Sequence, residues 1–299
     1  MDVPLEVAIR VRPPLRYDYT AVETPCIFPD SKHREILLLD KEVVTSDYVL
    51  GFESDQSDVF DVCVRPMLKQ IGPGRDGTII AFGPSGAGKS YTIFGPGFQF
   101  THSETSYGII PRIVRHMFFE LASKLSPCRY QVCISIVEVV NGHEKNLLRS
   151  ISTKEPPLGP EEPNAYYCED VAMAFSYLHI AMITRQHFLN SYRVFSSIGH
   201  VIVKLHITEN LVIGGSNENC SYKINIVDLA SLDRCFEVND QFNNHMGLVT
   251  LSYLATRPFV HPNNESIVPD IRLLEILQNI FTDDIKTLVI CCVSAPHHR

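Results

Sequence analysis

Residues 81–95, which read AFGPSGAGKSYTIFG, constrain the fold more than any other stretch of the sequence. They contain the spacing G-x-x-x-x-G-K-S, which is typical of a loop that holds nucleotide phosphates. Gly83, Gly86 and Gly88 permit backbone angles and close approaches that a side chain would block. Backbone N–H groups can then point at phosphate oxygens at the start of a helix. An apolar stretch before the loop and a helix-like stretch after it provide the context that this motif requires.

Two side chains of the loop are expected to contact the phosphates and their metal ion. Lys89 would bring positive charge to the outer phosphates, and the hydroxyl of Ser90 would be a ligand for Mg²⁺. We therefore predict that the loop binds a nucleotide together with Mg²⁺. The predicted binding positions in the loop are Gly83, Pro84, Ser85, Gly86, Ala87, Gly88, Lys89 and Ser90. The loop alone leaves open whether the nucleotide is hydrolysed or only held.

Composition and charge exclude several other classes of protein. The 299 residues carry a net charge of −8, so the chain is not steered toward nucleic acid or anionic lipid. No apolar run of the sequence reaches the roughly 20 residues that cross a bilayer, so we expect no membrane insertion. The nine cysteines form no C-x-x-C pair, which favours a reducing cytoplasm over a disulfide framework or a zinc site.

Strand-like and helix-like segments alternate along the whole chain and predict an α/β domain with a central sheet. The predicted strands are residues 6–12, 77–83, 130–140, 199–207, 222–230 and 286–295. The predicted helices are residues 57–71, 111–125, 170–190 and 270–281. The strands at 199–207 and 222–230 should pair, and residues 213–219 between them are rich in Gly and Asn, which predicts a turn region. We find no linker or repeat, so residues 1–299 are expected to form one domain.

A series of short segments, in this order along the chain, resembles a kinesin motor domain. They are VAIRVRPP, SDQSDVFDVCVRPML, GTIIAFGPSGAGKSYTIFG, YGIIPRIV, SIVEVVNG, FSSIGH, NIVDLAS and KTLVICCVSA. Together they span nearly all of residues 7–296, and their order is more specific than any one of them. The resemblance implies an α/β, kinesin-type phosphate-loop domain, with a central β-sheet and helices on both faces. It also implies ATP as the nucleotide and microtubules as the partner.

The resemblance further implies which residues flank the adenine. In kinesins these are an R-x-R-P segment and the aromatic residue or His that follows the loop's hydroxyl residue. The matching positions here are Arg10, Pro13 and Tyr91. An arginine plane and an aromatic ring both stack well on a base. Without the resemblance, Arg10 and Arg12 would be interpreted as part of a solvated strand edge.

The first loop that senses the γ-phosphate in kinesins, N-x-x-S-S-R-S-H, is altered here. It matches RVFSSIGH at residues 193–200, so Ile198 replaces the arginine and Gly199 replaces a serine. Ser197 is retained and is expected to be a ligand for Mg²⁺. Arg193 replaces the asparagine of this motif five residues before Ile198, and it is an alternative source of the lost positive charge.

The second such loop, D-L-A-G-S-E, matches DLASLD at residues 228–233. Asp228 is retained and can hold Mg²⁺ through water, whereas Ser231 replaces the glycine and Asp233 replaces the glutamate. In kinesins the first loop's Arg and the second loop's Glu form an ion pair that closes the site. Ile198 can neither donate a hydrogen bond nor carry charge. Because phosphoryl transfer depends on positioning and electrostatics, we expect impaired ATP hydrolysis with nucleotide binding retained.

The surface that kinesins present to the acidic microtubule lacks its usual positive charge in this sequence. The region at residues 238–255 contains no Lys or Arg, and the loop at residues 152–164 is acidic. In the Y-R-D-S-K-L-T-R-L-L-like segment, Arg272 takes the Lys position but Glu275 replaces the Arg. We therefore expect weak microtubule binding.

Within the kinesins, the altered loops and the GKSYT sequence most resemble the insect Costal family of kinesin-like scaffold proteins in Hedgehog signalling. That resemblance implies a cytoplasmic, cytoskeleton-associated scaffold whose partners include a kinase and a transcription factor. The alternative is an active ATP-driven microtubule motor with unusual loop chemistry.

Overall fold

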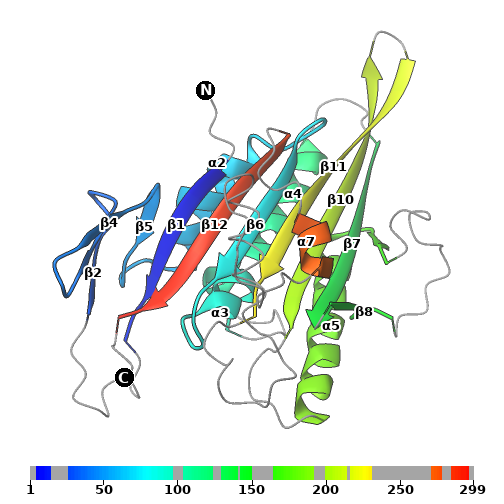
Figure 1. The fold of residues 1–299 in the computed structure, drawn as a ribbon. Helices are drawn as coiled ribbons and strands as arrows, with labels where there is room; N and C mark the ends of the chain where they lie inside the picture. The colour runs from blue at the N-terminus through cyan, green and yellow to red at the C-terminus, as the bar shows by residue number, and fades with distance from the viewer. Residues whose placement is uncertain are drawn as a thin grey trace.

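The computed structural model describes residues 5–14, 26–96, 104–123, 129–140, 142–149, 164–191, 199–213, 216–230, 271–277 and 284–295. The strands of its central sheet are β1 (Leu5–Arg12), β5 (Tyr48–Leu50), β6 (Asp76–Phe82), β7 (Arg129–Val140), β8 (His143–Asn146), β9 (Tyr166–Cys168), β10 (His200–Ile213), β11 (Ser216–Asp228) and β12 (Ile285–Ser294). They run in the order β5–β1–β12–β6–β11–β10–β7–β8, with β9 paired to β7 (Figure 1).

One half of this sheet is parallel. β5, β1, β12, β6 and β11 all run in the same direction, whereas β10 is antiparallel to both β11 and β7. The register pairs Arg10 with Cys292 and Asp228 with Ala81, so the carboxyl ends of the parallel strands lie along one edge. In open α/β sheets, ligands bind at that edge.

The helices cover both faces of the sheet, as the resemblance implied. They are α1 (Gln56–Val59), the π-helix η2 (Phe60–Val64), α2 (Arg65–Leu68), α3 (Lys89–Phe94), the 3₁₀ turn η3 (Glu104–Ser106), α4 (Ile109–Ser123), α5 (Val171–Ser191) and α7 (Ile271–Leu277). The main core packs α4, α5 and the α1–η2–α2 stretch against one face. Leu273 and Leu277 of α7 pack against Ile80 and Val227 on the other face (Figure 1). Among the described helices, none combines the length and the apolar character needed to cross a membrane.

The first helical stretch changes type along its length for local reasons. Asp55 caps α1, since its side chain accepts the N–H of Asp58 while the Asp58 side chain accepts the N–H of Asp55. Pro66 stands in the first turn of α2 and has no N–H to donate to the preceding turn. The wider π-helical turn η2 comes immediately before it, where the regular ladder of hydrogen bonds would be broken.

The predicted strands and helices are confirmed, but the predicted turn region at residues 213–219 is largely wrong. β10 and β11 continue through it, and Ile213 pairs with Ser216. The polar residues of this region accept strand geometry because the long antiparallel ladder satisfies their backbone N–H and C=O groups. Figure 1 shows this hairpin extending beyond the rest of the sheet.

A second, three-stranded sheet was missed by the sequence analysis. It consists of β2 (Ile27–Asp30), β3 (Glu35–Leu38) and β4 (Val43–Thr45), in that order. Its strands are short and are separated by charged turns, in which Arg34 and Lys41 take positive φ angles of 59° and 69°. Ile36 of β3 packs against Val11 and Ala295, so this sheet lies beside the ends of β1 and β12.

The contact between Gly108 and α3 predicts a large stability loss on substitution. A Cβ atom at Gly108 would lie 2.6 Å from the backbone of Ile93 and Phe94. We expect Gly108→Ala to lower the free energy of unfolding by about 2–3 kcal/mol, because the chain cannot shift without moving α3 or α4. Gly72→Ala is the matched control, since nothing lies within 4 Å of its added Cβ. Urea denaturation of the two variants measures the difference, and equal stabilities would contradict the contact.

Candidate functional site

The loop between β6 and α3 is built on glycines that the sequence analysis singled out. Gly83 has a φ angle of 145°, and a Cβ atom there would lie 2.1 Å from the carbonyl oxygen of Cys292 on β12. Gly86 and Gly88 have φ angles of 74° and 95°, and Gly88 caps α3 in a left-handed conformation. The predicted need for glycine is therefore confirmed at all three positions.

Lys89 lies at the base of this loop. Its side chain is buried, and Nζ donates hydrogen bonds of 2.9 Å to the carbonyl oxygens of Gly83 and Pro84. Ser85 is half-buried and Gly86 exposed, so they form the outer part of the loop, while Ala87 is buried beneath it. The ammonium group is thus bound by carbonyl oxygens of the loop. Hydrogen bonds to these neutral groups are weaker than hydrogen bonds to a carboxylate.

The structure brings together two of the predicted Mg²⁺ ligands. Ser90 Oγ donates a 2.6 Å hydrogen bond to Oδ2 of Asp228, which is the last residue of β11. Asp228 is 1% exposed, and its Oδ1 has no hydrogen-bond partner among the described residues. A hydroxyl beside a carboxylate with one unsatisfied oxygen fits Mg²⁺, which prefers oxygen ligands and keeps several waters.

Burial raises the pKa of Asp228, while the charge of Arg185, the hydrogen bond from Ser90 and the charge of Lys89 act in the opposite direction. The desolvation of the carboxylate is the largest of these effects. The group therefore needs nearby positive charge to stay ionised at neutral pH, which is the state that holds a metal ion.

Arg185 of α5 supplies part of that charge, and the sequence analysis missed it. Its Nε lies 3.1 Å from Oε1 of Glu138 on β7, and its Nη2 donates to the carbonyl oxygen of Gly199 at 3.2 Å. Its Nη1 lies 3.8 Å from Oδ2 of Asp228. The guanidinium group thus joins the central sheet, the end of the RVFSSIGH segment and the start of the DLASLD segment. All three side chains in this cluster are buried.

The end of the first loop is held tightly. A Cβ atom at Gly199 would lie 2.6 Å from Cγ of Glu138 and from Cγ2 of Val140, so a serine here would require a shift. The ring of His200 accepts the N–H of Ala230 through Nδ1 at 3.1 Å, which places the proton of a neutral ring on Nε2. This hydrogen bond therefore connects retained residues of the two altered motifs.

The altered positions Ile198, Ser231 and Asp233 lie outside the described residues, as does the retained Ser197. The expected loss of the ion pair between positions 198 and 233 therefore stays a prediction from the sequence.

Arg10 is positioned differently from the expectation. It is 8% exposed, and its Nη1 donates to Oε1 of Gln56 at 2.9 Å and to Oγ1 of Thr92 at 2.7 Å. The guanidinium carbon lies 5.5 Å from the centroid of the Tyr91 ring. Arg10 thus supports Tyr91 from within the protein, and it does not offer an open face to a base. Tyr91 is 45% exposed, so its ring is accessible from solvent for stacking.

The neighbouring residues at the end of β1 also border the loop. Nε of Arg12 donates to the carbonyl oxygen of Gly86 at 2.7 Å, and Pro13 is exposed. The interpretation of Arg10 and Arg12 as a solvated strand edge is therefore wrong. Both arginines tie β1 to the segment that begins at Gly83.

One of the missed residues left a signal in the sequence. Every second residue of a strand faces the same side, so Glu138 is expected to face the main core as Ile134 and Ile136 do. A charged side chain in the core needs a buried partner. Arg185 and Gln56 left no comparable signal, because nothing in a single sequence says which distant helix supplies the partner.

Comparisons with known proteins point to a single family. The family model of the kinesin motor domain matches residues 29–299. The kinesin-like protein KIF27 of Mus musculus is 26% identical over 321 residues, a match that covers 98% of this chain and 23% of the relative. The chromosome-associated kinesin KIF4B of Homo sapiens is 27% identical over 316 residues, covering 98% of this chain and 25% of the relative. This chain thus spans about a quarter of the length of these curated relatives.

A solved structure of a fast kinesin has the same fold. It superposes with a TM-score of 0.79 at 23% identity, and the match covers 98% of this chain and 86% of that chain.

The buried state of Asp228 predicts opposite effects of Asp228→Asn on binding and on stability. A folded-state pKa above the ordinary value of 3.8 means that the protonated form is preferred in the fold, so stability falls as pH rises through that pKa. Asn does not titrate, so urea denaturation between about pH 4 and pH 7 should show the variant gaining stability relative to the unaltered protein. Affinity for Mg-ADP should fall by roughly tenfold or more. The control Asp284→Asn changes the same charge at an exposed position, and a pH-independent difference would contradict the titration of Asp228.

Proposed function

The chain belongs to the kinesin motor domain family, and we propose that it binds Mg-ATP or Mg-ADP but hydrolyses ATP poorly. The observation that carries this proposal is the hydrogen bond of 2.6 Å between Ser90 and Asp228, beside an Asp228 oxygen without a partner among the described residues. It supports an assembled phosphate and metal site. The sequence, in contrast, lacks the Arg and Glu that close such a site in kinesins.

Nucleotide binding would use groups that come from three strands of the central sheet. The loop from Gly83 to Ser90 would hold the phosphates through backbone N–H groups and Lys89. Ser90, Ser197 and Asp228 would hold Mg²⁺, the last through water, and the ion would neutralise charge between the outer phosphates. Tyr91 and Pro13 would border the adenine, with Arg10 as the support of Tyr91.

Hydrolysis would be slow because two positioning groups are absent. Ile198 offers no positive charge toward the second loop, and Asp233 is one methylene shorter than the Glu it replaces. Gly199 allows close packing of the first loop's end on Glu138, an arrangement that a serine would disturb. Loss of a single such group typically costs about 3–4 kcal/mol of transition-state stabilisation.

Weak attachment to microtubules is supported by the ion pairs of Arg272. This arginine, at the position of a microtubule-facing Lys in kinesins, lies 2.5 Å from Oε2 of Glu144 and 2.7 Å from Oε2 of Glu275. Two carboxylates thus neutralise the one cation of α7, which would otherwise attract an acidic surface. Both contacts come from acidic residues of this chain, one on β8 and one on α7 itself.

On the resemblance to the insect Costal family, we further propose a scaffold role in cytoplasmic, Hedgehog-type signalling. The protein would be cytoskeleton-associated and would assemble a kinase and a transcription factor. We also propose that residues 1–299 form one motor domain. The pairing of β1 with β12 supports this, because it joins the first and last described strands.

A specific observation also favours the alternative of an active motor. Arg185 brings a buried cation to Asp228 and to the carbonyl oxygen of Gly199. It could therefore link the two sensing loops in place of the lost ion pair, although it is fixed to Glu138 at the same time.

Steady-state ATPase measurements with and without microtubules separate these two functions. We expect turnover at least about a hundredfold below that of a kinesin head that retains the Arg–Glu pair. The double variant Ile198→Arg, Asp233→Glu should raise kcat by about tenfold or more, whereas Ile198→Leu should leave it unchanged. Lys89→Ala should remove the thermal stabilisation by Mg-ADP. Strong microtubule stimulation of the unaltered protein would support the motor and overturn the proposal.

The ion pairs of Arg272 predict that microtubule affinity can be restored by charge. Glu275→Arg should increase binding by about tenfold at low salt, and added salt should abolish most of the gain. Glu144→Gln should give a smaller increase, because it only removes a negative charge beside Arg272, whereas Glu275→Arg removes one and also adds a positive charge. Glu42→Arg is the matched control, since it changes net charge equally at an exposed position in the turn between β3 and β4. Co-sedimentation with microtubules measures the effect, and equal gains for Glu275→Arg and Glu42→Arg would contradict it.

A further inference from the structure

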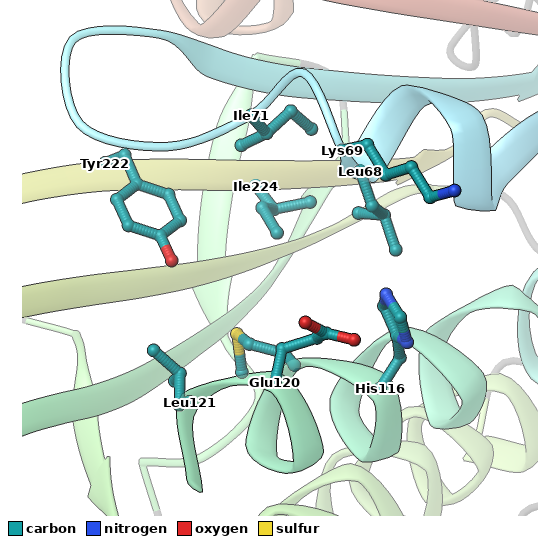
Figure 2. Close-up of a pocket in the computed structure, with 9 residues that line it drawn as sticks. Leu68, Lys69, Ile71, His116, Glu120, Leu121, Tyr222 and Ile224 are labelled. Carbon is teal, nitrogen blue, oxygen red and sulfur yellow. The ribbon is translucent and has the colours of Figure 1, made fainter. Parts of the chain in front are cut away.

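A cavity of about 350 Å³ lies between α2, α4 and β11. Its wall is apolar and includes Leu68, Ile71, Met117, Leu121 and Ile224 (Figure 2). Met117, Leu121 and Ile224 are nearly fully buried, so they belong to the main core and form the inner part of the cavity. A volume of this size would hold on the order of ten water molecules, but an apolar wall offers them few hydrogen bonds.

The shape of the cavity is fixed by neighbours outside it. Ile71 packs on Gly77 so closely that a Cβ atom there would lie 2.1 Å from Cδ1 of Ile71. Tyr222 donates its hydroxyl to Oε1 of buried Glu209 at 2.9 Å, which holds the ring at one end of the cavity. The cavity is therefore preformed, as small-molecule sites usually are, and its volume is within the range of such sites.

Three polar side chains stand at its mouth. Lys69, His116 and Glu120 are labelled around the opening in Figure 2. Within the described part of the chain, the side chains of Lys69 and Glu120 form no hydrogen bond or ion pair with each other or with another residue. Burial lowers the pKa of His116, so its ring is neutral at neutral pH and can both donate and accept a hydrogen bond.

The mouth thus carries one positive charge, one negative charge and one neutral donor and acceptor. An anionic ligand would be attracted by Lys69 but repelled by Glu120. A cationic ligand would be attracted by Glu120 but repelled by Lys69. A neutral head group that donates and accepts hydrogen bonds avoids both penalties. The apolar wall requires the rest of the ligand to be hydrophobic.

We propose that this cavity binds a neutral amphiphile, which is a compact molecule with an apolar alkyl or aryl body and a hydroxyl or amide head at the mouth. The site is distinct from the nucleotide loop. Tyr222 and Ile224 precede the end of β11, whereas Asp228 is its last residue. The proposal therefore stands independently of how the protein handles ATP.

Calorimetric titration with three matched probes tests the proposal. These are para-hexylphenol, para-hexylbenzoate and para-hexylbenzylamine, which are neutral, anionic and cationic at neutral pH. We expect the phenol to bind with a Kd on the order of 100 μM. Each charged analogue should bind about two- to fivefold more weakly. Failure of the phenol to bind, or tighter binding of either charged analogue, would overturn the proposal.

Variants locate the binding and test the role of the mouth. Leu121→Phe fills the inner part of the cavity and should abolish binding of the phenol. Leu68→Phe does the same from a half-buried position if the first variant does not fold. Glu120→Gln should favour the benzoate and Lys69→Gln the benzylamine, each by about two- to fivefold. Binding that persists in both Phe variants would show adsorption elsewhere on the protein and would contradict the assignment.

Discussion

The common direction of β5, β1, β12, β6 and β11 is the constraint on which the rest of this structure depends. Because these strands are parallel, the segments that follow β1, β6 and β11 all leave the sheet at one edge. That edge brings Arg12, the glycine-rich loop and Asp228 together from distant parts of the sequence. The antiparallel strands β10 and β7 continue the sheet beyond β11 and contribute His200 and Glu138 near Asp228, with Gly199 directly before β10.

Much of this arrangement could be predicted from the sequence, because its signals are local. The glycines at 83, 86 and 88 report backbone angles directly, and apolar periodicity located the long strands and helices within a few residues. The second sheet was not predicted, because its strands have only three or four residues and are separated by charged turns. The full length of the β10–β11 hairpin was not predicted either, since polar residues near a turn are compatible with either a loop or a hydrogen-bonded strand pair.

The partners of buried charges could not be predicted, for a physical reason. A buried Arg must be compensated, but its compensating group can come from any element that packs against it. Arg10 is held by Gln56 and Thr92, which lie 46 and 82 residues away along the chain. Arg185 reaches Glu138 across 47 residues. Only the packing of helices on the sheet decides such pairs. Arg10, which was expected to contact the base, therefore supports Tyr91 instead.

The central position of β12 has a consequence for how the protein is made. β12 is inserted between β1 and β6, and its Cys292 carbonyl oxygen lies directly under Gly83. During synthesis the ribosome releases β1 and β6 long before β12, so these two strands cannot complete their pairing until β12 has been made. The β10–β11 hairpin, whose partners are adjacent in sequence, can form without that delay. The loop that begins at Gly83 therefore gains its contact with Cys292 only after β12 has been synthesised. Until then the strand edges that β12 will cover are unpaired, and unpaired edges favour association with other chains.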